Sequence, residues 1–128
     1  MTIFALSSGP GLSGVAIIRI SGPESALVLK NITGKELPKP RVATLRKINN
    51  INTSGLIDEG IILWFPGPES YTGEDMAEIH VHGGKAVILA VQKEISKIEN
   101  CRLAEPGEFT KLAFQNGKIN LLKAESIA

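Results

Sequence analysis

The segment that decides the fold is Ser70-Tyr71-Thr72-Gly73-Glu74-Asp75-Met76-Ala77-Glu78-Ile79-His80-Val81-His82-Gly83-Gly84. Its composition predicts a loop followed by a strand that ends at two glycines. Side chains of a strand alternate between its two faces, so Glu78, His80 and His82 leave the same face of the predicted sheet. Carboxylates and imidazoles cost free energy to bury unless they are paired. We therefore expect this face of the sheet to be exposed to solvent or to bind a ligand.

Further strands are predicted on both sides of this segment. Apolar and β-branched residues predict strands at 3–6, 15–20, 42–48, 57–65 and 102–104. The Asn-, Ser- and Gly-rich residues 49–55 predict a hairpin between two of them.

Three helices are predicted between the strands. Ser21 and Glu24 have the spacing of a capping box and predict a helix that Gly34 ends. Apolar residues at helical spacing predict a second helix at about 84–99 and a third between Glu108 and Asn116. Together these elements predict an α+β domain: a mixed β-sheet with about three helices on one face.

Composition narrows the class of protein. With 128 residues, 43% of them hydrophobic and 21% charged, the chain is long enough for one globular domain. The formal charge is +1 and no run of Lys or Arg is present, so strong nucleic-acid binding by this chain alone is not indicated. The single cysteine, Cys101, excludes an intrachain disulfide and a cysteine-based zinc site. No apolar run reaches the roughly 18–20 residues of a membrane span, and no signal peptide is recognisable, which predicts a cytoplasmic protein.

Glycine-rich segments resemble phosphate-binding motifs only in part. Gly9-Pro10-Gly11-Leu12-Ser13-Gly14 matches G-x-G-x-x-G, but a strand follows it where a dinucleotide site needs a helix. The sequence contains no G-x-x-x-x-G-K-[ST], so it offers no P-loop. Gly83 and Gly84 open a predicted helix. Their free backbone N–H groups could bind an anion there, or the absence of side chains could let the start of the helix pack closely on the sheet.

The polar residues leave several interpretations open. His80 and His82, with Glu78, have the spacing of a zinc site, but they also suit hydrogen-bonding histidines. Arg19 lies in an apolar strand. Either its guanidinium extends from the strand into water, or the guanidinium binds an anion such as a carboxylate or a phosphate. Lys118 follows the last helix and becomes of interest only if it converges with Arg19 and Glu78.

In combination, the motifs resemble the N-terminal domain of the MnmE/TrmE (ThdF) tRNA-modification GTPases. The resemblance runs in order along essentially the whole chain. It is carried by Gly14-Val15-Ala16-Ile17-Ile18-Arg19-Ile20-Ser21-Gly22, Trp64-Phe65-Pro66-Gly67-Pro68-Glu69-Ser70-Tyr71-Thr72-Gly73-Glu74-Asp75, Glu78-Ile79-His80-Val81-His82-Gly83-Gly84, Ala104-Glu105-Pro106-Gly107-Glu108-Phe109-Thr110 and Ala113-Phe114-Gln115-Asn116-Gly117-Lys118-Ile119-Asn120-Leu121.

This resemblance implies a fold and a role. The fold would be similar to the tetrahydrofolate-binding domain of glycine-cleavage T-protein-like enzymes. The domain would form a homodimer and bind a reduced folate, 5-formyl- or methylene-tetrahydrofolate, which supplies a one-carbon unit for modifying the wobble uridine of tRNA. In the family, the partner is the FAD-containing MnmG (GidA), and a separate GTPase domain binds GTP, magnesium and potassium.

The resemblance also implies the binding residues and the domain limits. Folate contacts in the family match Arg19, Glu78 and Lys118 of this sequence. A carboxylate such as Glu78 can accept the donor edge of a pterin, and cations suit the folate tail. Residues 1–118 would form the folate-binding and dimerisation domain, and residues 119–128 the start of a following helical domain. Two alternatives remain: a small metal-dependent hydrolase using Glu78, His80 and His82, and a pure dimerisation module.

Overall fold

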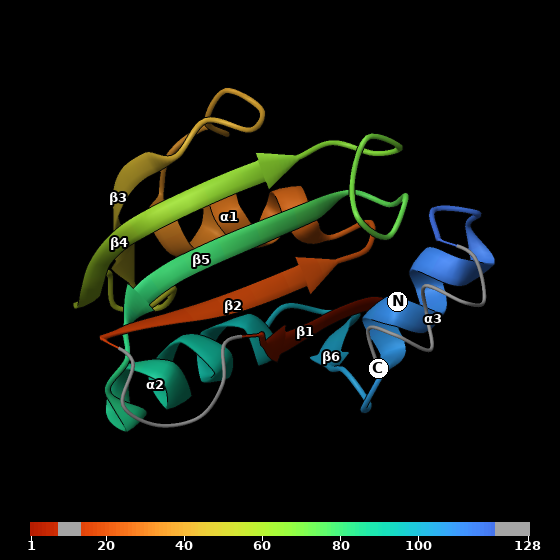
Figure 1. The fold of residues 1–128 in the computed structure, drawn as a ribbon. Coiled ribbons are helices and arrows are strands. Elements are labelled where there is room, and N and C mark those ends of the chain that lie inside the picture. The colour runs from red at the N-terminus through yellow and green to blue at the C-terminus, as the bar shows by residue number, and fades with distance from the viewer. Residues whose placement is uncertain (8–13, 120–128) are drawn as a thin grey trace.

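A six-stranded mixed sheet forms the centre of the protein (Figure 1). The computed structural model describes residues 1–7 and 14–119. The strands are β1 (Thr2–Leu6), β2 (Val15–Ser21), β3 (Thr44–Asn49), β4 (Leu56–Phe65), β5 (Met76–His82) and β6 (Cys101–Leu103). Their order in the sheet is β3-β4-β5-β2-β1-β6, with β1 and β6 parallel and all other neighbours antiparallel.

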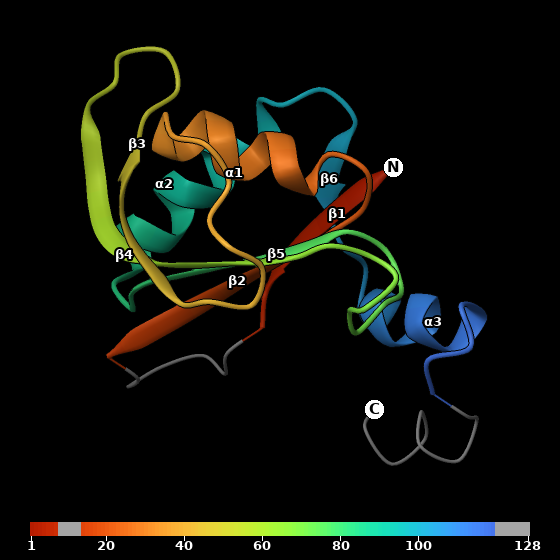
Figure 2. The same cartoon turned by 90° about the horizontal axis from the view of Figure 1, so that it is seen from above.

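Three helices complete the described part of the chain: α1 (Ser25–Thr33), α2 (Lys85–Ser96) and α3 (Glu108–Gln115). In Figure 2, α1 and α2 lie on one face of the sheet, while α3 lies beyond its end, beside the loop that joins β4 to β5. The predicted α+β class, with a mixed sheet and three helices, is therefore confirmed. Only α1 and α2 occupy the single face on which the helices were expected.

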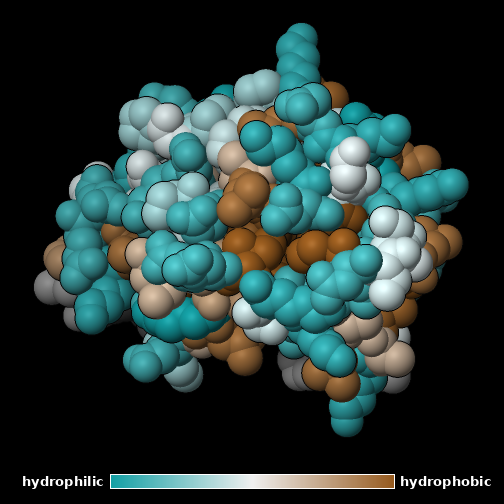
Figure 3. All heavy atoms as spheres, turned by 180° about the vertical axis from the view of Figure 1, so that it is seen from behind, coloured by the Kyte–Doolittle hydropathy of each residue, from teal (hydrophilic) through white to brown (hydrophobic). Residues whose placement is uncertain are grey.

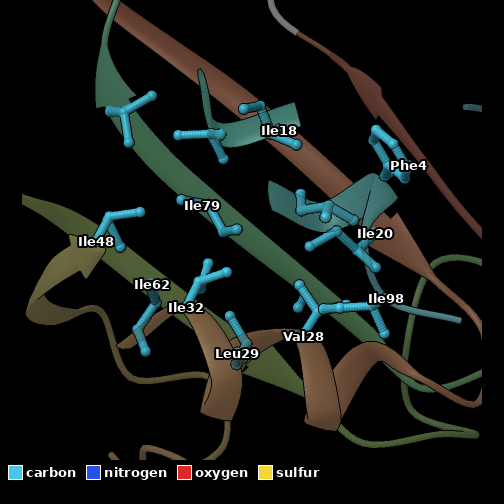
Figure 4. Close-up of a cluster of buried hydrophobic side chains, with 14 of the residues drawn as sticks. Phe4, Ile18, Ile20, Val28, Leu29, Ile32, Ile48, Ile62, Ile79 and Ile98 are labelled. Carbon is cyan, nitrogen blue, oxygen red and sulfur yellow. The ribbon is translucent and has the colours of Figure 1, made fainter. Parts of the chain in front are cut away.

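The hydrophobic core lies between the sheet and these two helices (Figure 4). Ile18, Ile20 and Ile79 of the central strands belong to this core together with Val28 and Leu29 of α1, and all five are at most 1% exposed. The outer surface of this layer is mostly hydrophilic, with a smaller hydrophobic area near its centre (Figure 3). Among the described residues, no helix covers the opposite face of the sheet, which we call the open face.

The capping box predicted at Ser21 is wrong. Ser21 is the last residue of β2, and its hydroxyl lies 2.8 Å from the Thr72 hydroxyl instead of capping a helix. Pairing with β5 keeps Ser21 extended, and Gly22 then turns the chain at a φ of 136°. Helix α1 begins three residues later than predicted, with Glu24 and not Ser21 at its N-cap and without a side-chain cap there.

Most other predicted boundaries are confirmed to within a few residues. Gly34 ends α1 in a left-handed conformation, and its amide donates to the carbonyl of Lys30. Strand β3 begins at Thr44 and not at residue 42, because Val42 is held in a turn by the carbonyl of Lys39. Helix α2 ends at Ser96, three residues early. The glycine-rich segment at 9–13 and the predicted helix beyond residue 119 lie outside the described residues.

Candidate functional site

A small cavity opens at the end of the open face where β2, β4 and β5 meet the loop of residues 66–75. Its volume is about 190 Å³, and its lining is mainly apolar. The lining residues are Arg19, Phe65, Tyr71, Met76 and Glu78. The cavity therefore combines two aromatic side chains and a thioether with one cation and one carboxylate.

Arg19 and Glu78 are brought together by the pairing of β2 with β5. The two residues lie directly opposite each other in the ladder. Nε and Nη2 of Arg19 each lie 3.2 Å from Oε2 of Glu78. The guanidinium carbon also lies 5.8 Å from the centre of the Tyr71 ring. Their side chains are 32% and 16% exposed, so the ion pair stays in reach of solvent and of a ligand.

The two histidines separate into different interactions. Nε2 of His80 lies 2.9 Å from Oε1 of Glu78 and thereby orients this carboxylate. The His82 side chain is 74% exposed, and its Nδ1 and amide N–H bind Asp58 at the start of β4. Burial raises the pKa of the Asp58 carboxyl, but the hydrogen bonds from the backbone and side chain of His82 and from the backbone of Glu59 act together in the other direction, and the pKa is lowered overall.

A zinc site at Glu78, His80 and His82 finds no support in this geometry. Within residues 1–7 and 14–119, no three His, Cys, Asp or Glu side chains are grouped to hold a metal ion. His82 turns to Asp58 instead, because that carboxylate accepts from both the backbone N–H and the ring Nδ1 of His82. A Cβ on Gly84 would meet nothing within 4 Å, so the close packing considered for this glycine is absent too.

Lys118 lies at the loop and not in the cavity. Its Nζ donates to the carbonyl of Pro68 at 2.9 Å, and it is absent from the cavity lining. Two further bonds hold the same loop: Asn116 Nδ2 donates to the carbonyl of Thr72 at 2.7 Å, and the Tyr71 hydroxyl lies 3.3 Å from that of Thr110. The structure thus brings Arg19 and Glu78 together and places Lys118 on the loop that walls their cavity.

Three lining residues, Phe65, Tyr71 and Met76, were not among the predicted site residues. Met76 lies two residues before Glu78 on β5, so strand alternation alone would have placed it on the same face. Phe65 reaches the cavity because it pairs with Met76 across β4 and β5. That register cannot be read from the sequence, since Tyr71 and its loop separate the two strands.

Comparison with known proteins identifies the family. The family model described as "GTP-binding protein TrmE N-terminus" matches residues 2–118. The chain belongs to this family.

Relatives of this TrmE N-terminal chain are found in bacteria and in animals. It is 76% identical over 128 residues to the tRNA modification GTPase MnmE of Pelagibacter ubique, covering 100% of the chain and 29% of that protein. It is 54% identical over 126 residues to the MnmE of Rhodopseudomonas palustris, covering 98% of the chain and 28% of that protein. Over 127 residues it is 50% identical to the zebrafish mitochondrial 5-taurinomethyluridine-[tRNA] synthase subunit GTPB3, covering 99% of the chain and 25% of that protein. The chain thus spans less than a third of the length of these relatives.

None of the helices in the described part of this TrmE N-terminal chain is long and apolar enough to cross a membrane.

Helix α3, which supports the loop, is tied to β6 by a paired arginine and carboxylate. Nη1 and Nη2 of Arg102 lie 2.8 and 2.5 Å from the two carboxylate oxygens of Glu108. The amide of Glu105 also donates to Oε1 of Glu108 at 2.9 Å. A bidentate guanidinium–carboxylate pair fixes both position and orientation. It therefore holds the first turn of α3 against the edge of the sheet.

The Glu108 carboxyl is expected to titrate far below its ordinary range. The hydrogen bonds from Arg102 lower its pKa from 4.5 to about 2, against a smaller rise from burial. Because the folded pKa is depressed, this contribution to stability is complete above pH 4.5 and is lost as the pH falls toward 2. A carbon-detected NMR titration of the side-chain carboxyl measures the pKa directly. Replacement by glutamine should flatten the fall in stability between pH 4.5 and 2, and a titration midpoint near 4.5 would contradict the pairing.

Proposed function

We propose that this TrmE N-terminal domain binds a reduced folate, 5-formyl- or methylene-tetrahydrofolate, with its pterin ring in the cavity beside Glu78. The observation that carries the proposal is the combination within one cavity: a carboxylate and a guanidinium stand among Phe65, Tyr71 and Met76. An apolar cavity with a few placed polar groups is the usual form of a small-molecule site. Flat heteroaromatic rings suit such walls, because aromatic side chains pack against them face or edge.

Glu78 has the capacity to read the donor edge of a pterin, which presents an exocyclic amine beside a ring N–H. Its two oxygens offer about four acceptor positions. In the structure, Oε1 accepts from His80 and Oε2 from Arg19. Three of these positions are taken, two on Oε2 by Arg19 and one on Oε1 by His80, so a bidentate contact with a pterin requires Arg19 to release one of its two bonds to Oε2. Until a ligand binds, His80 and Arg19 hold the carboxylate in one orientation. This assigns the two neighbours a positioning role around the group that recognises the pterin.

The size of the cavity limits which part of the folate it encloses. At about 190 Å³ it is smaller than the roughly 300–1,000 Å³ of sites that enclose a drug-sized ligand. We assign the pterin to it, and the benzoylglutamate tail to the surface outside. Arg19 at the rim and exposed Lys118 on the loop supply cations for the tail and for the one-carbon substituent.

The relatives' names supply the wider role. They are described as tRNA modification GTPases and as a 5-taurinomethyluridine-[tRNA] synthase subunit. We propose that this domain delivers a one-carbon unit from its folate for wobble-uridine modification in tRNA. It would do so beside a GTPase domain that binds GTP, magnesium and potassium, with an MnmG/GidA-type FAD protein as partner. The chain itself would bind and position the folate without catalysing a reaction of its own.

We also propose that the domain acts as a homodimer. Val15 and Leu45 are 50% and 58% exposed, and both line a hollow of about 300 Å³ on the sheet together with Ile61 and His80. Exposed apolar surface of this kind favours association with a second molecule. A second copy of the chain is the occupant we propose, because the family resemblance implies a homodimer.

A competition experiment tests the pterin assignment. Isothermal titration of the chain with 5-formyltetrahydrofolate is expected to give saturable binding at one site per protomer. Tetrahydropterin, which has no tail, should compete, whereas p-aminobenzoylglutamate at the same concentration should compete far less. Equal competition by the tail fragment would contradict the placement of the pterin beside Glu78. A concentration-dependent dimer with no folate response would instead support a pure dimerisation module.

A further inference from the structure

The outer edge of the sheet at β3 carries a concentration of positive charge. Residues 30–47 contain six Lys or Arg and a single acidic residue, Glu36. The remaining 110 residues contain eight Lys or Arg and twelve Asp or Glu. Residues 30–47 therefore carry a formal charge of about +5, although the formal charge of the whole chain is only +1. The sequence shows no continuous run because these residues are spread over the end of α1, a connection and β3.

Folding gathers three of these cations around one surface hollow, which we call the basic hollow. Its volume is about 580 Å³, and its lining includes Lys35, which follows α1, together with Arg46 and Lys47, which are consecutive in β3 and leave opposite faces of this outer strand. Thr33, Leu45, Asn49 and Glu59 complete the lining. Glu59 is its single carboxylate and lies opposite Lys47 in the β3–β4 ladder. Three cations against one carboxylate leave the hollow with a net positive charge.

These cations have few partners within the described residues. No carboxylate there lies within ion-pair distance of Lys35, Arg46 or Lys47, whereas Arg19, Lys97 and Arg102 are all paired. Nη1 of Arg46 donates to the carbonyl of Leu45 at 2.9 Å, and its buried Nε has no hydrogen-bond partner in this part of the chain.

Structural roles account for each of these cations separately, but not for the presence of all three in the lining of one hollow. Lysines near the end of α1 complement the negative end of the helix dipole. Charged residues on an outer strand such as β3 prevent edge-to-edge pairing. Neither role requires two elements to place their cations in the lining of one hollow.

We propose that the basic hollow and the neighbouring cations of residues 30–47 bind the phosphate backbone of RNA. Guanidinium and ammonium groups are the usual partners of phosphate oxygens, and hydroxyl and amide groups add contacts to them. Strand β3 is about 20 Å long, which suits a series of phosphates better than a single anion. RNA is the polyanion we choose, because the relatives of this family are named for tRNA modification. The proposal does not depend on folate binding, since the basic hollow shares no lining residue with the Glu78 cavity.

The test measures binding of a fluorescein-labelled tRNA transcript to the chain by anisotropy, over a range of salt concentrations. Three phosphate contacts predict that log Kd changes by about two to three per tenfold change in salt. The variant K35Q/R46Q/K47Q should raise Kd by at least tenfold at low salt and remove most of this salt dependence. Because Arg46 is partly buried, K35E/K47E, which changes only exposed side chains, serves as a second variant and should weaken binding as strongly.

A matched control separates the site from the overall charge. K85Q/K93Q/K111Q removes the same charge from three exposed lysines on α2 and α3 and should change Kd less than threefold. An equal loss in this control would show non-specific attraction and overturn the proposal. So would tRNA binding undetectable at 1 mM protein. The proposal would also fail if both basic-hollow variants lost binding to vesicles containing phosphatidylserine while tRNA binding stayed unchanged.

Discussion

Replacement of Glu78 by glutamine is expected to weaken binding of 5-formyltetrahydrofolate by about thirtyfold or more. The amide keeps the size of the carboxylate but has one acceptor oxygen and no charge, so it cannot accept two N–H groups of a pterin in bidentate fashion. A hydrogen bond to a charged group contributes about 1.5–3 kcal/mol, and about 2 kcal/mol corresponds to a thirtyfold change in Kd. Isothermal titration of both proteins measures the change.

The fold should survive this substitution, which makes the result interpretable. Glu78 is partly exposed, and the partners it leaves, Arg19 and His80, are 32% and 24% exposed and remain hydrated. Glu99→Gln removes the same charge from an exposed site distant in the sequence and should leave Kd unchanged. If Glu78→Gln also left Kd unchanged, the folate would have to bind elsewhere on the domain.

Much of the sheet follows from local patterns in the sequence. Alternation predicts Ile79 and Val81 inside and Glu78 and His80 outside, and the structure has this arrangement. The hairpin of β3 and β4 follows equally from its Asn-, Ser- and Gly-rich turn. Ser21 was misread because a capping box is a local pattern, whereas the pairing of Ser21 with Met76 joins residues far apart in the chain.

The candidate site illustrates the same difference between local and long-range information. The family resemblance implied Arg19 and Glu78 as binding residues. No spacing rule shows that these two residues pair, because α1, β3 and β4 lie between β2 and β5 along the chain. Buried Glu94 was not predicted either. Its carboxylate accepts the amide of Ile51 at 2.8 Å and pairs with Lys97, which ties α2 to the β3–β4 turn. A charged residue on the inner side of a helix is recognisable only when its distant partner is known.

Substitution of Gly60 by alanine is expected to lower the free energy of unfolding by about 3 kcal/mol or more. A Cβ at this position would lie 2.1 Å from the carbonyl oxygen of His80 and 3.1 Å from its carbon, both of them backbone atoms. A rotamer change cannot relieve such a clash, so β4 and β5 would have to move apart within the sheet. Overpacking usually costs about 1–3 kcal/mol, and here the lost ladder hydrogen bonds add to it. Urea unfolding followed by circular dichroism measures the difference.

Gly84→Ala provides the matched control, because a Cβ there meets nothing within 4 Å and the residue has an ordinary φ of −65°. Both substitutions reduce the entropy of the unfolded chain equally, so the difference between them isolates the clash. The displaced carbonyl belongs to His80, whose ring orients Glu78. Under conditions where Gly60→Ala remains folded, it should therefore weaken folate binding as well. A stability within about 1 kcal/mol of the Gly84→Ala control would show that β4 does not approach β5 closely at this point, and would remove the support for the Glu78 geometry.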